Sequence, residues 1–268
     1  GGGSVRAARF RFGWALGTGL VCSAAWAGPV PVALSINAKV AFDLVNSSAP
    51  VNASQTGTLT ARNGGADTTA SFTGAPSGGP LSGALTQTGD GIGVHFQASG
   101  SSANGDSTAG YLFADYTFDL ANSSATETFT LVFKALFGAA GNKTDASGVD
   151  AFAESLLSVF DTSNVEVIYS DFLSDTVNPG NNKSAASGSD EYTLSLAPGQ
   201  TASFTAFQKM RGGAFVRGAF DVDLDAFLRL ESIQSDRVPP PNDVPAPASL
   251  PLTLTALGLL ALARRRQH

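Results

Sequence analysis

Asp221, Asp223 and Asp225 form the cluster of this sequence whose residue types are best suited to bind a cation. Their D-x-D-x-D spacing matches the start of a calcium-binding loop, but Ala226 stands where that loop needs glycine and Ser232 where it needs glutamate. Apolar residues alternate with the aspartates, which predicts a strand whose next-but-one residues lie ~6.6 Å apart. Because calcium ligands lie ~2.4 Å from the ion, we expect a solvated acidic strand face and keep a calcium site as the alternative.

Catalytic signatures are missing from the sequence. His95 is the only histidine before the C-terminal residue, so neither a histidine dyad nor a histidine-based zinc cluster can be built. We expect it to be a solvated or hydrogen-bonded strand residue. The sequence has no nucleophile elbow, phosphate-binding loop, zincin motif or dinucleotide fingerprint. Two carboxylates can serve glycoside hydrolysis, but no motif selects a pair among the 22 acidic residues. The sequence therefore predicts a protein that is not an enzyme, with a hydrolase as the weaker alternative.

The elements that must carry these residues are strands. Residues 34–45 alternate between apolar and polar side chains, as in a strand with one buried face. Asn63-Gly64-Gly65 is typical of a hairpin turn, and residues 74–83 and 178–189 read as loops. Many short strands with frequent turns predict an all-β fold for residues 28–236, a single antiparallel β-sandwich of the jelly-roll-like type. The other predicted strands are 55–61, 68–73, 92–96, 111–120, 128–137, 192–196, 202–207 and 214–230.

Residues 149–160 fit two interpretations. Their apolar residues follow the spacing of a helix, and Ser147 with Asp150 would cap it. Against a helix, residues 158–160 run into a turn at 161–164 and then into an apolar stretch at 165–169. We favour strand, turn, strand.

The first 27 residues have the layout of a secretory signal peptide, with a basic part, an apolar part and an A-x-A cleavage site for signal peptidase. The alternatives are a buried N-terminal helix and lipid modification of Cys22. These parts comprise Arg6, Arg9 and Arg11, then residues 12–25, then Ala25, Trp26 and Ala27 before Gly28.

The part of the chain between the two terminal segments is acidic and contains no cysteine. Six of the 16 basic residues lie in the terminal segments, which leaves 10 basic and 22 acidic residues, a net charge of −12. This charge repels phosphates, so we expect no nucleic-acid partner. The only cysteine is Cys22, so the exported part contains none. At roughly 215 residues it is large enough to bury a core without disulfides.

The last 32 residues have the layout of a sorting signal. A Pro-rich linker, residues 237–249, precedes a segment, 250–268, that is apolar from Leu250 to Ala263 and then basic. The terminal arginines argue against a GPI anchor, and the L-P-x-T-G pentad of a sortase signal is incomplete. The motif residues are Val244, Pro245, Ala246 and Pro247, followed by Arg264, Arg265 and Arg266.

This C-terminal layout resembles the PEP-CTERM sorting domain of Gram-negative bacteria. The chain departs from it at Ala246, where the family carries glutamate. The resemblance implies export, a transient tether in the inner membrane, cleavage by an exosortase near the Pro-x-Pro motif, and a final place at the cell surface or in the extracellular matrix. It also implies an association with extracellular polysaccharide and biofilm. The apolar run of about 14 residues would span ~21 Å as a helix, short of a ~30 Å hydrocarbon core, which suits a temporary anchor.

These observations predict an exported surface or matrix protein with a structural or polysaccharide-associated role. The alternative is a carbohydrate-binding module, which commonly stacks sugars on exposed aromatic rings. Both tryptophans lie in the signal peptide. The tyrosines that remain for stacking are Tyr111, Tyr116, Tyr169 and Tyr192.

Overall fold

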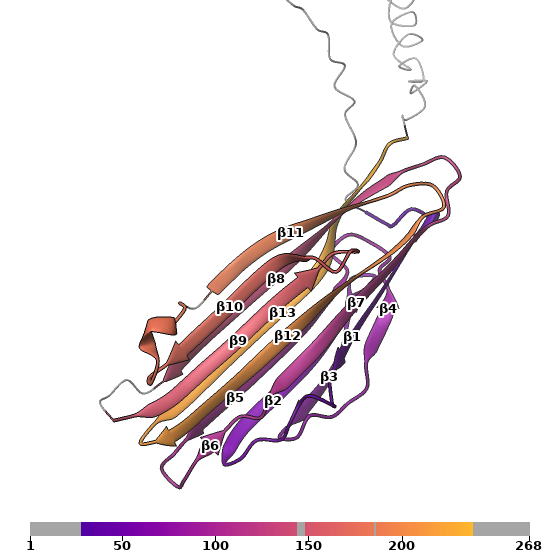
Figure 1. Ribbon diagram of the computed structural model, residues 1–268. Coiled ribbons are helices and arrows are strands. Elements are labelled where there is room, and N and C mark those ends of the chain that lie inside the picture. Colours follow the sequence, from indigo (N-terminus) through magenta and orange to yellow (C-terminus); the bar gives the residue numbers. More distant parts are fainter. Residues whose placement is uncertain (1–27, 144–147, 185, 238–268) are drawn as a thin grey trace, which may run out of the picture. The chain divides into compact units, whose positions relative to one another are not determined.

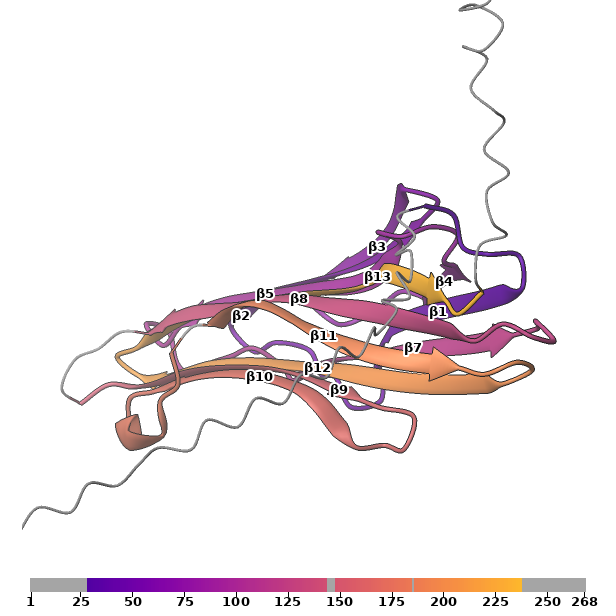
Figure 2. The same ribbon diagram turned by 90° about the horizontal axis from the view of Figure 1, so that it is seen from above.

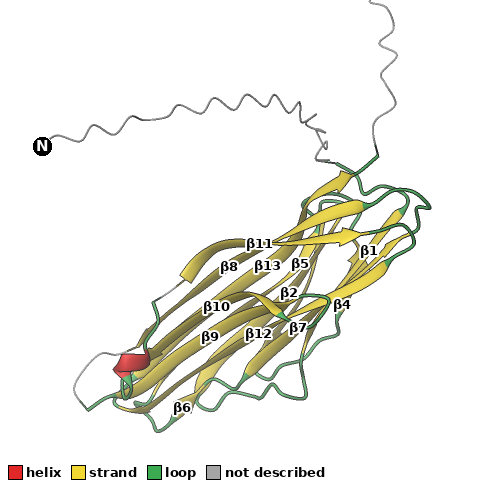
Figure 3. Cartoon of the chain, turned by 45° about the horizontal axis from the view of Figure 1, so that its top comes forward, coloured by secondary structure: helices red, strands yellow, loops and turns green. Residues whose placement is uncertain are grey.

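The computed structural model describes residues 28–143, 148–184 and 186–237 (Figure 1). The chain divides into two units, Gly1–Asp236 and Arg237–His268, and every described strand belongs to the first. Pro179–Asn181 forms one turn of 3-10 helix, η1, drawn red among the yellow strands of Figure 3. The strands are β1 (Leu34–Phe42), β2 (Ala53–Asn63), β3 (Ala66–Thr73), β4 (Leu81–Ala84), β5 (Gly91–Ser101), β6 (Ser107–Thr108), β7 (Leu112–Asn122), β8 (Phe129–Lys143), β9 (Asp150–Phe160), β10 (Glu166–Asp175), β11 (Ala186–Leu196), β12 (Thr201–Val216) and β13 (Ala219–Ser235).

The strands form two antiparallel sheets that face each other as two layers (Figure 2). The seven-stranded sheet has the order β10-β9-β12-β7-β1-β4, with β6 paired to β12. The six-stranded sheet has the order β11-β8-β13-β5-β2-β3. The chain repeatedly changes sheet, as from β7 to β8 and from β8 to β9, so sequence neighbours often lie in opposite layers. This arrangement confirms the predicted antiparallel, jelly-roll-like β-sandwich.

The core lies between the sheets and is built by strict alternation. Along β1, Leu34, Ile36, Ala38, Val40 and Phe42 are buried, while the residues between them reach solvent. Successive strand residues point to opposite faces, so this pattern follows from the apolar period of two in the sequence. Burial of side chains from both sheets supplies the main stabilising free energy of the fold.

Aromatic rings from both sheets meet near the middle of the core. Phe118 and Phe204 stack with their ring centroids 4.5 Å apart, and Phe133 of the opposite sheet packs edge-on against both, at 5.3 and 4.8 Å. Tyr192 of β11 contacts Phe204 at 5.1 Å in the same edge-on manner. These offset and edge-to-face arrangements are the ones that aromatic quadrupoles favour. The cluster ties the two layers together without a disulfide.

A fully buried carboxylate, Asp90, holds the hairpin between β2 and β3. Its oxygens accept hydrogen bonds from the backbone amides of Gly64 (2.8 Å) and Gly65 (2.9 Å), and from those of Thr86 (2.8 Å) and Gln87 (3.1 Å). Gly64 and Gly65 have φ of 60° and 78°, the left-handed backbone that glycine adopts without strain. Burial raises the pKa of Asp90, but the backbone amides outweigh it and hold the pKa below its ordinary value. The hairpin turn predicted at this site is confirmed.

Several strand boundaries differ from the sequence-based prediction. The favoured strand interpretation of residues 149–160 is confirmed as β9, but the predicted strand 214–230 is wrong as a single element. A tight turn at Arg217 and Gly218 divides it, with Arg217 at φ 50°, so β12 ends at Val216 and β13 starts at Ala219. The predicted loops 74–83 and 178–189 are too long, because cross-strand pairing to β1 and β8 recruits their ends into β4 and β11.

Candidate functional site

Most predicted sorting residues lie outside the described part of the chain. Of the signal-peptide site, Gly28 alone is described, and its amide donates a hydrogen bond to Thr88 Oγ1 at 3.1 Å. Within the described ranges, no helix is both long enough and apolar enough to cross a membrane. The roles predicted for Ala25, Ala27, Val244, Pro245, Ala246, Pro247, Arg264, Arg265 and Arg266 stay predictions, because these residues are not described.

The predicted acidic cluster lies on β13, on the outer surface of the six-stranded sheet. Asp221, Asp223 and Asp225 alternate there with buried apolar residues, as the sequence predicted. Asp223 Oδ2 lies 2.9 Å from His95 Nε2 and accepts a hydrogen bond from Gln97 Nε2 at 2.8 Å. His95 is thus a hydrogen-bonded strand residue, as expected. Across the described residues, no group of three or more histidine, cysteine or acidic side chains is placed to hold a metal ion.

Asp225 differs from its neighbours in its ionisation. Partial burial by surrounding side chains raises its pKa, His95 opposes that rise, and the negative charge of Asp223 adds to it. His95 lies directly opposite Asp225 on β5, in the strand register, while its ring contacts Asp223. The acidic row is therefore held by local partners rather than arranged around one ion.

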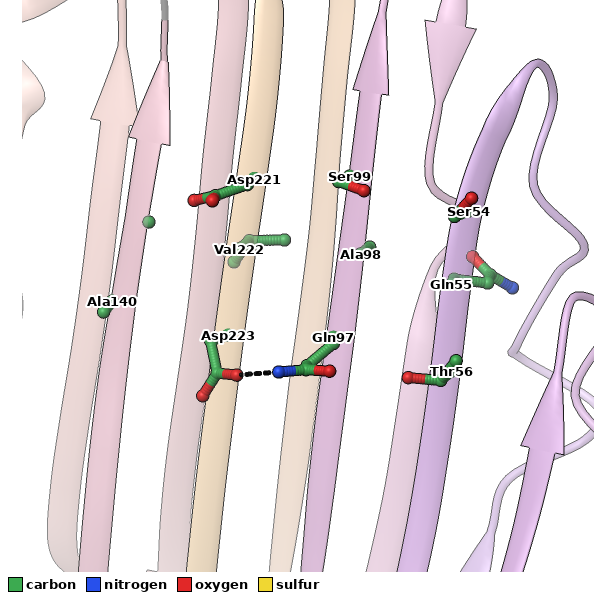
Figure 4. A pocket seen from close by; sticks show the side chains of 11 residues that line it. Ser54, Gln55, Thr56, Gln97, Ala98, Ser99, Ala140, Asp221, Val222 and Asp223 are labelled. Carbon is green, nitrogen blue, oxygen red and sulfur yellow. Dashed lines mark hydrogen bonds between the residues drawn. The ribbon is translucent and has the colours of Figure 1, made fainter.

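A shallow groove of about 470 Å³ runs over this outer surface (Figure 4). Its polar residues come from three neighbouring strands, while Ala140 and Gly141 of β8 leave the space open. Hydroxyl, amide and carboxylate groups line it, and no aromatic ring does. The groove can exchange hydrogen bonds with a polar molecule but offers no stacking surface. Together with His95 and Asp225, its polar residues Ser54, Thr56, Gln97, Ser99, Asp221 and Asp223 form what we name the polar face.

The outer surface of the seven-stranded sheet has a different character, because aromatic side chains gather on it. The rings lie in parallel pairs with centroids 5.9 Å (Tyr111–Phe113), 6.2 Å (Phe152–Phe215) and 6.0 Å (Phe160–Phe207) apart. Tyr111 and Phe215 are 43% and 37% exposed. The six rings come from the adjacent strands β9, β12 and β7, with Tyr111 directly before the first residue of β7. We name the surface made by Tyr111, Phe113, Phe152, Phe160, Phe207 and Phe215 the aromatic face.

An ion cluster lies within the aromatic face. Glu154 accepts a hydrogen bond from Lys209 Nζ at 2.7 Å and another from Arg211 Nε. The Arg211 guanidinium lies 5.3 Å from the ring centroid of Tyr111 and 5.2 Å from that of Phe152, and Nη1 donates to the Tyr111 hydroxyl at 2.7 Å. Burial raises the pKa of Glu154, but the hydrogen bonds and charges of its two cationic partners lower it by more. The four polar side chains are therefore fixed in position.

The tyrosines predicted as sugar platforms separate into two pairs. Tyr111 and Tyr169 are exposed, at 43% and 50%, on the outer side of the seven-stranded sheet. Tyr116 is excluded, because it is buried and its hydroxyl donates to Gln208 in the core. Tyr192 packs against Phe204 of the core and is also unsuited to stacking.

Comparisons with known proteins give no family and only weak structural likenesses. No protein-family model and no curated protein sequence matches the chain. The chain is similar to a subviral particle of infectious bursal disease virus VP2, with 12% identity, a TM-score of 0.17, and 91% of this chain and 75% of that chain covered. A structure of the Gt strain of the same virus gives 10% identity, a TM-score of 0.19, and coverage of 88% and 73%. Likenesses this weak carry no argument about function.

Proposed function

We propose that this chain is an exported cell-surface or extracellular-matrix protein of the PEP-CTERM type, with a structural or polysaccharide-associated role. The observation that carries this proposal is the combination of a signal-peptide layout at the start with the Val244–Pro247 motif, apolar run and Arg264–Arg266 at the end. A cysteine-free β-sandwich with a large buried core suits such a role, because its stability does not depend on disulfide formation after export. The protein has no catalytic activity of its own in this proposal.

The proposed processing needs three partners. Signal peptidase removes residues 1–27, the inner membrane holds the apolar C-terminal segment for a short time, and an exosortase cuts near Pro245 and Pro247. The three arginines stay in the cytoplasm under the positive-inside tendency and set the orientation of the segment. Ala246 removes the negative charge that the family motif carries, so cleavage is slower than with glutamate.

Mass spectrometry of the protein recovered from the host's surface tests this proposal. We expect an N-terminus at Gly28 and a C-terminus close to Pro247. Ala246→Glu should raise the processed fraction, and replacement of Arg264, Arg265 and Arg266 by alanine should lower it. Recovery of a surface form that is intact through Arg266 would contradict exosortase processing.

The second candidate function is that of a carbohydrate-binding module. The exposure of Tyr111 and Tyr169 on one side of the sandwich favours it, because flat rings accessible to solvent are what sugar stacking requires. Retention of the purified chain on the host's own extracellular polysaccharide tests it. Absence of retention would favour a purely structural part.

A further inference from the structure

We propose that the aromatic face binds a neutral polysaccharide, with the ion cluster of Glu154, Lys209 and Arg211 hydrogen-bonding its hydroxyl groups and the surrounding rings contacting its apolar faces. The inference rests on the proposed function, since it names the ligand that an exported matrix protein would hold. It places the ligand on the outer side of β7, β9 and β12.

The first support is the composition of the face. Pyranose rings present C–H groups on their flat sides and hydroxyl groups around the edge. A complementary surface therefore needs aromatic rings and hydrogen-bonding groups close together, as ligand sites with a few placed polar groups commonly have. Tyr111 directly precedes β7, Arg211 lies on β12 and Phe152 lies on β9, and the guanidinium is about equally far from the two ring centroids, at 5.3 and 5.2 Å. Phe113 and Phe215 extend the aromatic surface beyond Tyr111 and Phe152.

The second support is that the polar groups are already held in place. Arg211 is fixed by Glu154 and by the Tyr111 hydroxyl, and Lys209 is fixed by Glu154. Because the Tyr111 oxygen accepts from Arg211, its own hydrogen is available to a ligand oxygen. A lysine ammonium has three hydrogens, so Lys209 also keeps donors beyond its bond to Glu154. Groups that are ordered before binding lose little conformational entropy on binding.

The arrangement of charge argues against a protein partner. Protein–protein interfaces are enriched in aromatic residues and arginine, but they are depleted of lysine and glutamate. The aromatic face instead has Glu154 and Lys209 paired at its centre, with rings around them. A two-fold dimer centred on this face would bury Glu154, Lys209 and Arg211 against their own copies, at a high desolvation cost. The ligand is neutral because the net charge of −12 outside the terminal segments repels polyanions.

The test is binding of the full chain to the host's extracellular polysaccharide, separated by ion exchange into neutral and anionic fractions. We expect binding to the neutral fraction, with a dissociation constant raised about tenfold or more by Tyr111→Ala and by Arg211→Ala. Tyr111→Phe keeps the ring and should weaken binding by less. Phe215→Ala, at the exposed end of the face, gives a second ring variant if Tyr111→Ala does not fold.

Arg62→Ala is the matched control. Arg62 also pairs with a carboxylate, Asp67, and lies 5.3 Å from the ring centroid of Phe227, but it belongs to the six-stranded sheet. Its loss should leave the dissociation constant unchanged. The inference is overturned by absence of binding to the neutral fraction, by binding to the anionic fraction alone, or by unchanged binding in folded Tyr111→Ala and Phe215→Ala. It is also overturned if Tyr111→Ala abolishes a dimer in sedimentation without affecting retention.

The experiments distinguish failure of polysaccharide binding from failure of the proposed export and processing. The binding assay uses purified protein and does not depend on export. An exported and processed surface form that binds no neutral polysaccharide would refute the inference and leave the proposed function standing. A chain that is never exported would refute the proposed function whatever the assay shows.

Discussion

The two outer surfaces of this sandwich obey the same alternation and yet carry different residues. On the polar face, outward positions of β2, β5 and β13 are mainly hydroxyl, amide and acidic side chains, including Asp223 and Gln97. On the aromatic face, the corresponding positions of β7, β9 and β12 carry phenylalanine and tyrosine around Glu154. The core imposes no requirement on either surface, because both sets of side chains point away from it.

Folding and solvation explain the residues of the polar face, but they do not explain those of the aromatic face. A polar outer surface is what an antiparallel sheet presents to water. Single exposed apolar residues are also common, but clustered ones mark contact surfaces. The aromatic face therefore calls for a ligand, whereas the polar face, groove included, is accounted for by solvation and by its own hydrogen bonds.

The largest expected effect comes from replacing Asp90. This change should destabilise the whole fold, so it separates an effect on stability from an effect on ligand binding. Asp90→Ala leaves the amides of Gly64, Gly65, Thr86 and Gln87 without their acceptor in a buried place. We expect a loss of about 3–5 kcal/mol in the free energy of unfolding, measured by urea denaturation. Because the whole fold is destabilised, the polar face and the aromatic face should lose their structure together. A loss below about 1 kcal/mol would show that the hairpin does not depend on this carboxylate.

A second prediction compares the ion pairs of the two outer surfaces. The Glu154 side chain is 18% exposed and holds two cations, whereas Asp67 is 42% exposed and holds Arg62 alone. Glu154→Ala should lower the free energy of unfolding by about 1–3 kcal/mol, because Lys209 and Arg211 lose a partly buried acceptor. Asp67→Ala should cost clearly less than Glu154→Ala, because water and salt screen this exposed ion pair. Equal losses of unfolding free energy in the two variants, measured by urea denaturation, would contradict this prediction.

The pH dependence of stability should have opposite signs on the two surfaces. The lowered pKa of Glu154 means that its contribution is present above its ordinary pKa and is lost as the pH falls through the lowered value. The raised pKa of Asp225 means that its contribution is present at low pH and is lost as the pH rises through the raised value.

Comparison of the unfolding free energy of the wild type with that of Glu154→Gln and of Asp225→Asn, between about pH 3 and 7, checks this prediction. The wild type should lose its advantage over Glu154→Gln on acidification. Over the same range it should gain relative to Asp225→Asn. Shifts of the same sign in both comparisons would contradict it.

The smallest expected effect is that of calcium on the polar face. Asp221, Asp223 and Asp225 lie along one strand surface, and ~6.6 Å separates next-but-one residues of a strand. Ligands of one calcium ion converge at ~2.4 Å, so the melting temperature should be the same in chelator and in millimolar calcium. A calcium-dependent rise that Asp223→Asn abolishes would restore the cation site.

The β-sandwich could be predicted because the sequence patterns that indicate its strands and turns are local. The alternation at residues 34–45 and the Asn63-Gly64-Gly65 turn each identify an element within a short window. Strand pairing is not local. No local pattern in residues 81–84 or 186–189 indicates a strand. These residues become strands by pairing with β1 and β8, which lie far away in the sequence. The Arg217-Gly218 turn was missed because apolar residues flank it closely on both sides.

The aromatic face was missed for a related reason, although a signal for it existed. Residues 149–160 look helical because β9 carries apolar side chains on both surfaces, with Phe152 and Leu156 facing outward and Leu157 inward. A strand of this kind breaks the period of two, and here that break coincides with the aromatic face. The partnership of Glu154 with Arg211 depends on the register between β9 and β12, which the sequence does not reveal.

The position of β13 also determines when the molecule can fold. It is the last described strand along the chain, yet it lies inside the six-stranded sheet, between β8 and β5. Ala219 pairs with Ser101 and Phe220 with Lys143, so that sheet stays divided until residues near 235 are available. Pairings this distant in sequence form slowly. The sandwich therefore cannot close until nearly all of residues 28–235 are available for pairing.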